Sequence, residues 1–98
     1  IENSKMLGYW HSENPIKTDK KNVLTTVYKK NNQALLCVYN FSDESEEFSF
    51  NIDTKLLGFE VKNAEKIELG SNSREKADIS KSFRLEGRSG TMFLIKQA

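Results

Sequence analysis

The sequence of residues 23–41, VLTTVYKKNNQALLCVYNF, decides the fold class of this chain. Two runs rich in β-branched, aromatic and aliphatic residues flank Asn31 and Asn32. Asparagine tolerates the positive φ angles that a two-residue hairpin turn requires. The pattern therefore predicts an antiparallel hairpin in which residues 23–30 pair with residues 33–41.

A two-residue turn also fixes which residues lie opposite one another in the hairpin. Because residues 34–39 are apolar at every position, we expect the second strand to be central and covered on both faces, which would bury Cys37. The turn predicts the following cross-strand pairs: Leu24 with Tyr39, Thr26 with Cys37 and Tyr28 with Leu35 on one face, and Val27 with Leu36 on the other.

Further short segments have the composition of strands, and polar turns separate them. Phe48, Phe50 and Ile52 alternate with polar residues, so one face of that segment is expected to be buried, with Phe50 as a core residue. The remaining strand-like segments are residues 64–69, 81–85 and 91–96.

The connections carry recognisable turn and cap signals. Residues 42–47, SDESEE, are typical of a solvated hairpin tip, and residues 70–77 are expected to form a polar loop. Asp53 is suited to cap a short helix that runs to Leu57 and ends at Gly58. With no long amphipathic helix in the sequence, these elements predict an all-β fold, a small antiparallel two-sheet β-sandwich of about six to eight strands.

Residues 1–22 have a different character from the rest of the chain. They show no sustained period, and Pro15 disfavours a helical conformation at Asn14. We therefore expect residues 1–22 to form a lead-in without core elements, a linker from a preceding domain, and residues 23–98 to form the sandwich.

Composition excludes several classes of function. The chain has 15 basic and 14 acidic side chains, a formal net charge of +1, so it has no field that would recruit nucleic acid. No apolar stretch approaches the roughly 20 residues of a membrane span. The single cysteine cannot form a disulfide within the chain, so the fold must be held by packing.

No group of residues has the spacing of a catalytic or metal site. His11 is the only histidine and has no partner at a metal-ligand spacing. Cys37 lies in the most apolar strand, where burial raises the pKa of a thiol. The acidic residues 43–47 lack the spaced ligands and the central glycine of a calcium loop. We therefore expect no catalytic residue, no metal site and no cofactor.

The cluster Tyr9, Trp10 and His11 is the strongest candidate for an interaction site. Aromatic rings stack on the apolar faces of sugars, and rings with a polar edge also suit an interface between domains. Because these residues precede the expected sandwich, a domain interface is favoured over sugar binding.

Three short segments, in this order along the chain, carry a resemblance to a known family. They are Gly8-Tyr9-Trp10, residues 13–18 (ENPIKT) and residues 23–28 (VLTTVY), and a lysine-rich hairpin follows them. The chain resembles the C-terminal β-sandwich of large bacterial glycoside hydrolase-like proteins, in the β-N-acetylgalactosaminidase-related group. In that family a (β/α)₈ barrel precedes the sandwich and carries the catalytic carboxylates.

The resemblance implies a non-catalytic accessory domain that stabilises or orients the catalytic barrel. It also implies that Tyr9 and Trp10 pack in the interface with the barrel, and that the protein lies in the periplasm, on the cell surface or outside the cell. Two alternatives remain open: a carbohydrate-binding module that uses exposed rings such as Tyr9, Trp10, Tyr28 or Tyr39, and a free-standing interaction module of immunoglobulin-like shape.

Overall fold

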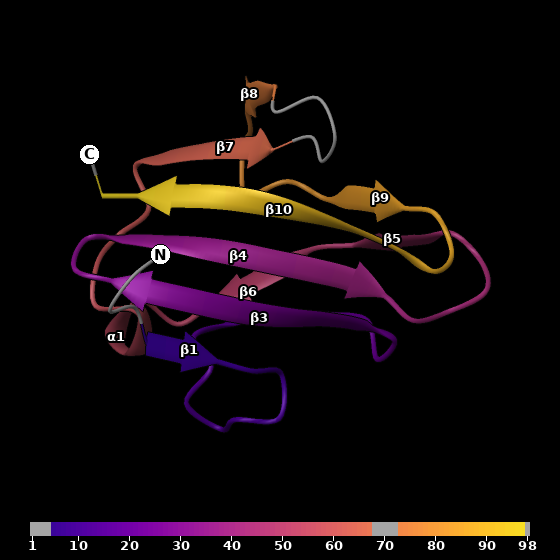
Figure 1. Ribbon diagram of the computed structural model, residues 1–98, viewed down its shortest axis with the longest axis horizontal. Helices are drawn as coiled ribbons and strands as arrows, with labels where there is room; N and C mark the ends of the chain where they lie inside the picture. The colour runs from indigo at the N-terminus through magenta and orange to yellow at the C-terminus, as the bar shows by residue number, and fades with distance from the viewer. Residues whose placement is uncertain (1–4, 68–72, 98) are drawn as a thin grey trace.

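A computed structural model of the chain describes residues 5–67 and 73–97, which form two packed layers of antiparallel strands (Figure 1). The front layer is a six-stranded sheet in the order β1-β3-β4-β10-β7-β8. The rear layer consists of the pairs β2-β6 and β5-β9. The strands are β1 (Lys5–Leu7), β2 (Ile16–Thr18), β3 (Val23–Lys30), β4 (Gln33–Asn40), β5 (Glu46–Phe48), β6 (Phe50–Ile52), β7 (Asn63–Ile67), β8 (Arg74–Lys76), β9 (Phe83–Leu85) and β10 (Ser89–Lys96).

The hairpin of β3 and β4 has the register that the sequence predicts. Asn31 has a φ of 54°, the left-handed conformation that the two-residue turn demands. All four predicted cross-strand pairs are present, including Val27 opposite Leu36, both of which are fully buried. The all-β antiparallel architecture is therefore confirmed, together with the element that specifies it.

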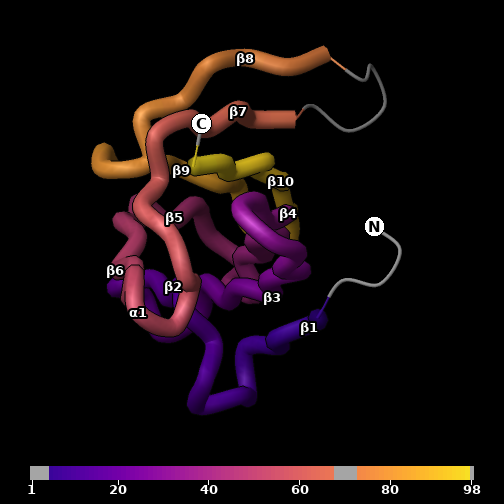
Figure 2. The backbone as a smooth tube through the Cα atoms, turned by 90° about the vertical axis from the view of Figure 1, so that its left-hand side faces the viewer, coloured from indigo at the N-terminus to yellow at the C-terminus, as the bar shows by residue number. Residues whose placement is uncertain are grey.

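Only one face of the six-stranded sheet is covered. Along β3 as far as Val27, and along β4, every second residue is buried, whereas Leu35 and Cys37 on the opposite face are half-buried and Tyr39 is exposed. The expectation that β4 is covered on both faces is therefore wrong, and so is the expectation that Cys37 is buried. The rear layer packs on one side of the sheet, as Figure 2 shows, and no described element lies over the other side.

The rear layer is built around a single extended run that changes partner at its middle. β5 pairs with β9, Ser49 interrupts the run, and β6 then pairs with β2. The interruption is held by Asp19, whose backbone N–H donates to the Ser49 carbonyl at 3.1 Å and whose carboxylate accepts the Ser49 N–H at 2.9 Å. The second sheet of the sandwich is thus two short pairs joined end to end.

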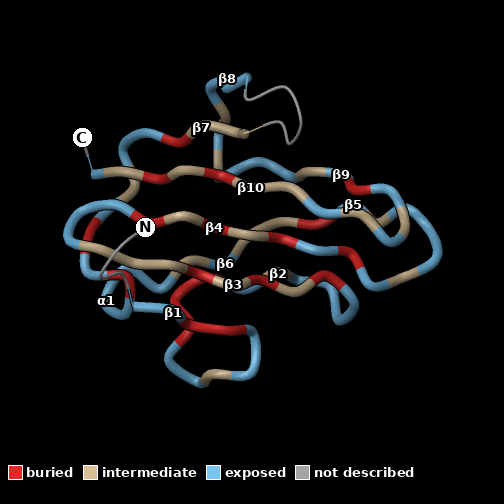
Figure 3. Tube along the Cα trace, in the orientation of Figure 1, coloured by how far each residue is buried: buried red, intermediate tan, exposed pale blue. Residues whose placement is uncertain are grey.

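Phenylalanine rings join the two layers. Phe93 of β10 is fully buried, and its ring lies 5.6 Å from Phe50 and 4.9 Å from Phe83, centroid to centroid. Phe48 is also fully buried and contacts Phe50 at 5.4 Å. Phe50 itself is half-buried and packs against the core from its margin. The buried residues, red in Figure 3, alternate with less buried ones along β4.

A short helix, α1 (Thr54–Leu57), follows β6 as the sequence predicts. The Asp53 carboxylate accepts the backbone N–H groups of Lys55 at 3.0 Å and Leu56 at 3.2 Å, and Gly58 ends the helix with a φ of 91°. These contacts satisfy donors that a helix leaves free at its start. The cap orients α1 so that Leu57 is buried.

Residues 5–22, the described part of the expected lead-in, contribute to the core, contrary to expectation. β1 pairs with β3, and β2 pairs with β6. Leu7 is 5 % exposed and Ile16 is fully buried. Each of these strands has three residues and one fully or nearly buried apolar side chain, so no periodic pattern marks it in the sequence.

Two other expectations on the chain between β7 and β9 need adjustment. The predicted polar loop of residues 70–77 contains β8, which pairs with β7 and places charged residues opposite one another, such as Glu65 opposite Lys76; residues 70–72 lie outside the described part of the chain. The strand expected over residues 64–69 is observed as β7, and residues 68 and 69 lie outside the described part of the chain.

Buried Asn40, the last residue of β4, ties two turns together. Its amide nitrogen donates to the carbonyls of Glu44 at 2.9 Å, Leu85 at 3.1 Å and Glu86 at 3.2 Å. Its amide oxygen accepts the Ser42 N–H at 2.9 Å. The turn after β4 and the turn before β10 are thereby fixed to the same side chain.

We expect Asn31→Val to destabilise the chain by about 1–2 kcal/mol, because a β-branched residue resists the left-handed conformation. Asn31→Gly is the matched control and should leave the free energy of unfolding nearly unchanged, since glycine adopts positive φ without strain. Urea denaturation followed by circular dichroism measures both, and equal stability of the two variants would contradict the assigned turn.

Candidate functional site: an exposed aromatic cluster

The loop between β1 and β2 presents the three residues that the sequence singles out. Tyr9 is 50 % exposed, Trp10 is 61 % exposed and His11 is half-buried. The Tyr9 and Trp10 rings meet edge to face, with centroids 5.1 Å apart and planes at 88°. The Trp10 and His11 rings are also 5.1 Å apart. The structure therefore brings all three residues together on the surface.

Buried Asn14 holds both ends of this loop. Its amide nitrogen lies 3.3 Å from the Leu7 carbonyl oxygen, 3.2 Å from that of Gly8 and 3.1 Å from that of Thr25. Its amide oxygen accepts the Ile16 N–H at 3.0 Å. A buried amide with its donors and acceptor satisfied fixes the loop conformation, because each alternative would leave polar groups unpaired.

Gly8 and His11 close the loop from the other side. The Gly8 N–H donates to His11 Nδ1 at 2.8 Å, and the His11 N–H donates to the Gly8 carbonyl at 3.0 Å. The six-membered ring of Trp10 occupies the space that a Cβ atom on residue 8 would need. Glycine at this position therefore allows the indole ring to lie against the backbone.

Two further rings extend the cluster onto the sheet. Phe41 lies 6.5 Å from Tyr9 and 4.6 Å from Tyr39, centroid to centroid. Both are exposed, Phe41 by 45 % and Tyr39 by 38 %. We call Tyr9, Trp10, His11, Tyr39 and Phe41 the aromatic cluster. Phe41 was not singled out from the sequence, although the alternation Leu35, Cys37, Tyr39 continues to it.

A shallow hollow of about 330 Å³ lies beside the aromatic cluster on the six-stranded sheet. Cys37 is half-buried in it, and burial raises the pKa of its thiol above the ordinary value. The lining is mostly apolar and comprises Tyr9, Leu24, Thr26, Cys37, Val38, Tyr39, Phe41, Gly90, Thr91 and Met92.

The titratable groups serve turns and surface ion pairs. Asp43 pairs with Arg88 at 2.9 Å between exposed side chains, across the two turns that Asn40 anchors. The hydroxyl and the N–H of Ser80 hold the pKa of exposed Asp78 below its usual range, and this contact forms a local turn. Within residues 5–67 and 73–97, no group of three or more His, Cys, Asp or Glu side chains could hold a metal ion.

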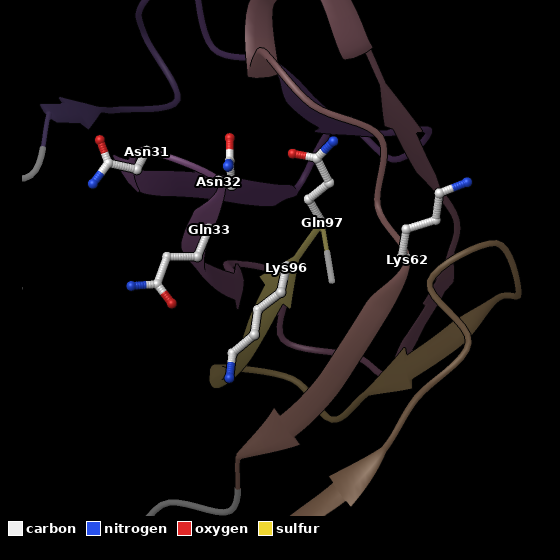
Figure 4. A pocket seen from close by; sticks show the side chains of 6 residues that line it. All are labelled: Asn31, Asn32, Gln33, Lys62, Lys96 and Gln97. Atoms are coloured by element: carbon white, nitrogen blue, oxygen red, sulfur yellow. The ribbon is translucent and has the colours of Figure 1, made fainter.

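Three other hollows are larger, and residues with polar side chains make up most of their linings. One of about 430 Å³ lies beside β7 and β8. Another of about 640 Å³ lies at the β3–β4 turn and the end of β10, and its lining side chains fan out instead of converging (Figure 4). A third of about 830 Å³ lies between the start of β2 and α1. No helix in the described residues is long and apolar enough to cross a membrane. The hollow beside the aromatic cluster has the most apolar lining of these hollows, which suits it best to a contact with another molecule.

Comparison with known proteins gives one family match and one informative structure. The family described as glycoside hydrolase 123, C-terminal domain, matches residues 1–96. A Bacillus halodurans protein described as a "putative alpha-N-acetylgalactosaminidase" has a similar fold, with a TM-score of 0.58 and 13 % sequence identity. The alignment covers 97 % of this chain but 21 % of that protein. No curated protein sequence matches the chain.

We expect Asn14→Ala to lower the free energy of unfolding by about 1–3 kcal/mol, because it removes the amide from its buried partners. The Trp10 fluorescence should change in the folded state as the loop loosens. Asn51→Ala, at an exposed position on β6, is the control and should change stability by less than about 0.5 kcal/mol. A rigid, unaltered Trp10 signal in Asn14→Ala would contradict the anchoring role.

The raised pKa of Cys37 predicts an altered pH dependence of thiol alkylation. In the folded chain the rate should still be rising with pH where the rate of the urea-unfolded chain has levelled off, since the thiolate is the reactive form. Alkylation with iodoacetamide, quenched at timed intervals and followed by mass spectrometry, measures the rate against pH for both states. Coincident pH–rate profiles would be inconsistent with a desolvated thiol.

Proposed function

Because the chain belongs to the family of glycoside hydrolase 123 C-terminal domains, we propose that it is a non-catalytic accessory domain that stabilises or orients the catalytic part of a glycoside hydrolase. The family match over residues 1–96 carries this proposal. The Bacillus halodurans structure supports it through the fold, which there forms a fifth of a much longer chain.

The surface chemistry supports a role in contact more than a role in hydrolysis. Most glycoside hydrolases place two carboxylates about 5–10 Å apart across a cleft. Several acidic side chains here are instead exposed and paired with a neighbouring cation: Lys5 with Glu13 at 3.9 Å, Glu60 with Lys62 at 3.2 Å, and Asp43 with Arg88. The apolar hollow beside the aromatic cluster has no such pair in its lining.

An accessory domain of this kind would act through binding energy. A domain that packs against the folded catalytic part, and not against its unfolded form, raises the stability of that part by mass action. Large rings with a polar edge, such as Tyr9 and Trp10, are typical of the anchors in such interfaces. Their anchored loop would present them without further ordering.

A second candidate function is recognition of a glycan by the aromatic cluster. The 61 % exposure of Trp10 favours it, since an open indole face stacks on a sugar ring. The geometry favours it less, because Tyr9 and Trp10 stand at 88° and do not form one flat platform. The family match also favours an accessory domain over a free-standing interaction module.

The proposal predicts that, in the full-length protein that contains this domain, the catalytic part carries out hydrolysis and this domain stabilises it. The isolated chain should not hydrolyse chromogenic α- or β-N-acetylgalactosaminides, whereas the full-length protein should. Deletion of the domain should lower the melting temperature of the catalytic part, because the packing that stabilises it is lost. Enzyme assays and differential scanning calorimetry on the three forms provide the test.

Two outcomes would contradict the proposal. Hydrolysis by the isolated chain would make the domain catalytic, and an unchanged melting temperature and activity after deletion would deny it a supporting role. Titration of the isolated chain with N-acetylgalactosamine and a panel of oligosaccharides, followed by Trp10 fluorescence, tests the second candidate, and a saturable response would favour glycan recognition.

A further inference from the structure

The face of the six-stranded sheet that points away from the rear layer is apolar across its centre. Cross-strand register defines this face, because Val27, Leu36 and Phe93 form a fully buried row and the adjacent rows must point the other way. We call it the outer face, and it is turned toward the viewer in Figure 1. Its central rows are Met6–Tyr28–Leu35–Leu94, Thr26–Cys37–Met92–Ile67 and Leu24–Tyr39–Gly90.

A solvated face of an antiparallel sheet is normally polar. Here Met6 is 42 % exposed, Tyr39 is 38 % exposed, and Leu35, Met92 and Leu94 are half-buried. The aromatic cluster continues this surface without a break, since the Tyr39 and Phe41 rings are in contact. A contiguous apolar surface of this kind marks a site of protein contact.

Charge surrounds the apolar centre on two sides and is mostly positive. Beyond the row of Leu35 and Leu94, the next row along the strands contains Lys30 and Lys96. At the β8 edge of the sheet the rows end in Lys76 and Arg74, with Glu65 as the acidic member. A second copy of the face would carry the same positive rim, so self-association is disfavoured, whereas a surface with acidic residues around an apolar centre is complementary.

The polypeptide enters the described structure at this same face. β1 is the edge strand of the six-stranded sheet, and Met6 at its middle belongs to the outer face. Whatever precedes β1 in a longer chain is therefore tethered beside the outer face, where a covalent link raises its effective concentration. The Bacillus halodurans chain, of which this fold occupies 21 %, shows that a large remainder can accompany such a domain.

We propose that the outer face is the surface on which the preceding catalytic domain of the same polypeptide packs, with the aromatic cluster as one end of the contact. This inference rests on the proposed accessory function and adds the face, the orientation and the chemistry of the partner. The catalytic domain contributes an apolar patch opposite Leu35, Cys37 and Met92. It contributes carboxylates opposite Lys30 and Lys96.

A pair of substitutions at equal exposure separates docking from folding. Tyr39→Glu places a charge on the outer face, and Leu56→Glu places the same charge on α1 in the rear layer, where the side chain is 39 % exposed. In the full-length protein we expect Tyr39→Glu to lower the melting temperature by about 2–4 °C or more, and Leu56→Glu to have little effect. Tyr39→Glu should also open the interdomain link to limited proteolysis.

A second variant and a labelling experiment distinguish the loss of an interdomain contact from misfolding of the domain. Met6→Glu, at the edge of the outer face, should reproduce the effect of Tyr39→Glu while the isolated chain keeps its circular dichroism spectrum. In the wild type, maleimide labelling of Cys37, followed by peptide mass spectrometry, should be slower in the full-length protein than in the isolated chain.

The outcomes distinguish this inference from the proposed function. If deletion of the domain destabilises the catalytic part but Tyr39→Glu and Met6→Glu behave like Leu56→Glu, the accessory role stands and the outer face is not the contact. If deletion has no effect, the proposed function fails first. A dimer of the isolated chain in analytical ultracentrifugation, abolished by Tyr39→Glu, would assign the face to a second copy and overturn the inference.

Discussion

The register of the β3–β4 hairpin is the constraint on which the rest of the structure depends. A shift of one residue would turn every side chain of one strand to the opposite face. If β4 shifted against β3, Leu36 would point away from the rear layer, and Leu35 or Cys37 would have to fit against the phenylalanine core. Asn31, in its left-handed conformation, excludes that shift, and β1 and β10 take their register from the strands it aligns.

Two buried asparagines fix the conformations of loops that adjoin this sheet. Asn14 and Asn40 use the same arrangement, with an amide nitrogen directed at three carbonyls and an amide oxygen that accepts the N–H two residues ahead. One fixes the loop that carries Tyr9 and Trp10, and the other fixes the turns after β4 and before β10. The aromatic cluster lies between them, so its rings are positioned by backbone that has little freedom.

The sequence predicted the parts of this fold that depend on local chemistry. The hairpin register follows from the turn residues at 31 and 32, the short helix follows from Asp53 and Gly58, and the contact among Tyr9, Trp10 and His11 follows from their adjacency. The sequence did not predict β1, β2 or β8, because three-residue strands are too short for a period and are stabilised by tertiary pairing. It also did not predict which face of β4 is left uncovered by this chain. An apolar residue gives the same sequence pattern whether this chain or a partner covers it.

The side chain of Asn40 has a consequence for how this chain can be produced. Residues 40–42, Asn-Phe-Ser, match the acceptor pattern for N-linked glycans, in which the sugar is attached to the asparagine amide nitrogen. In the fold that nitrogen is buried and donates to the carbonyls of Glu44, Leu85 and Glu86. A glycan on Asn40 and the native conformation of the turns around it therefore exclude each other. A eukaryotic secretory host that modified this residue would produce a chain in which the turns after β4 and before β10 cannot adopt that conformation.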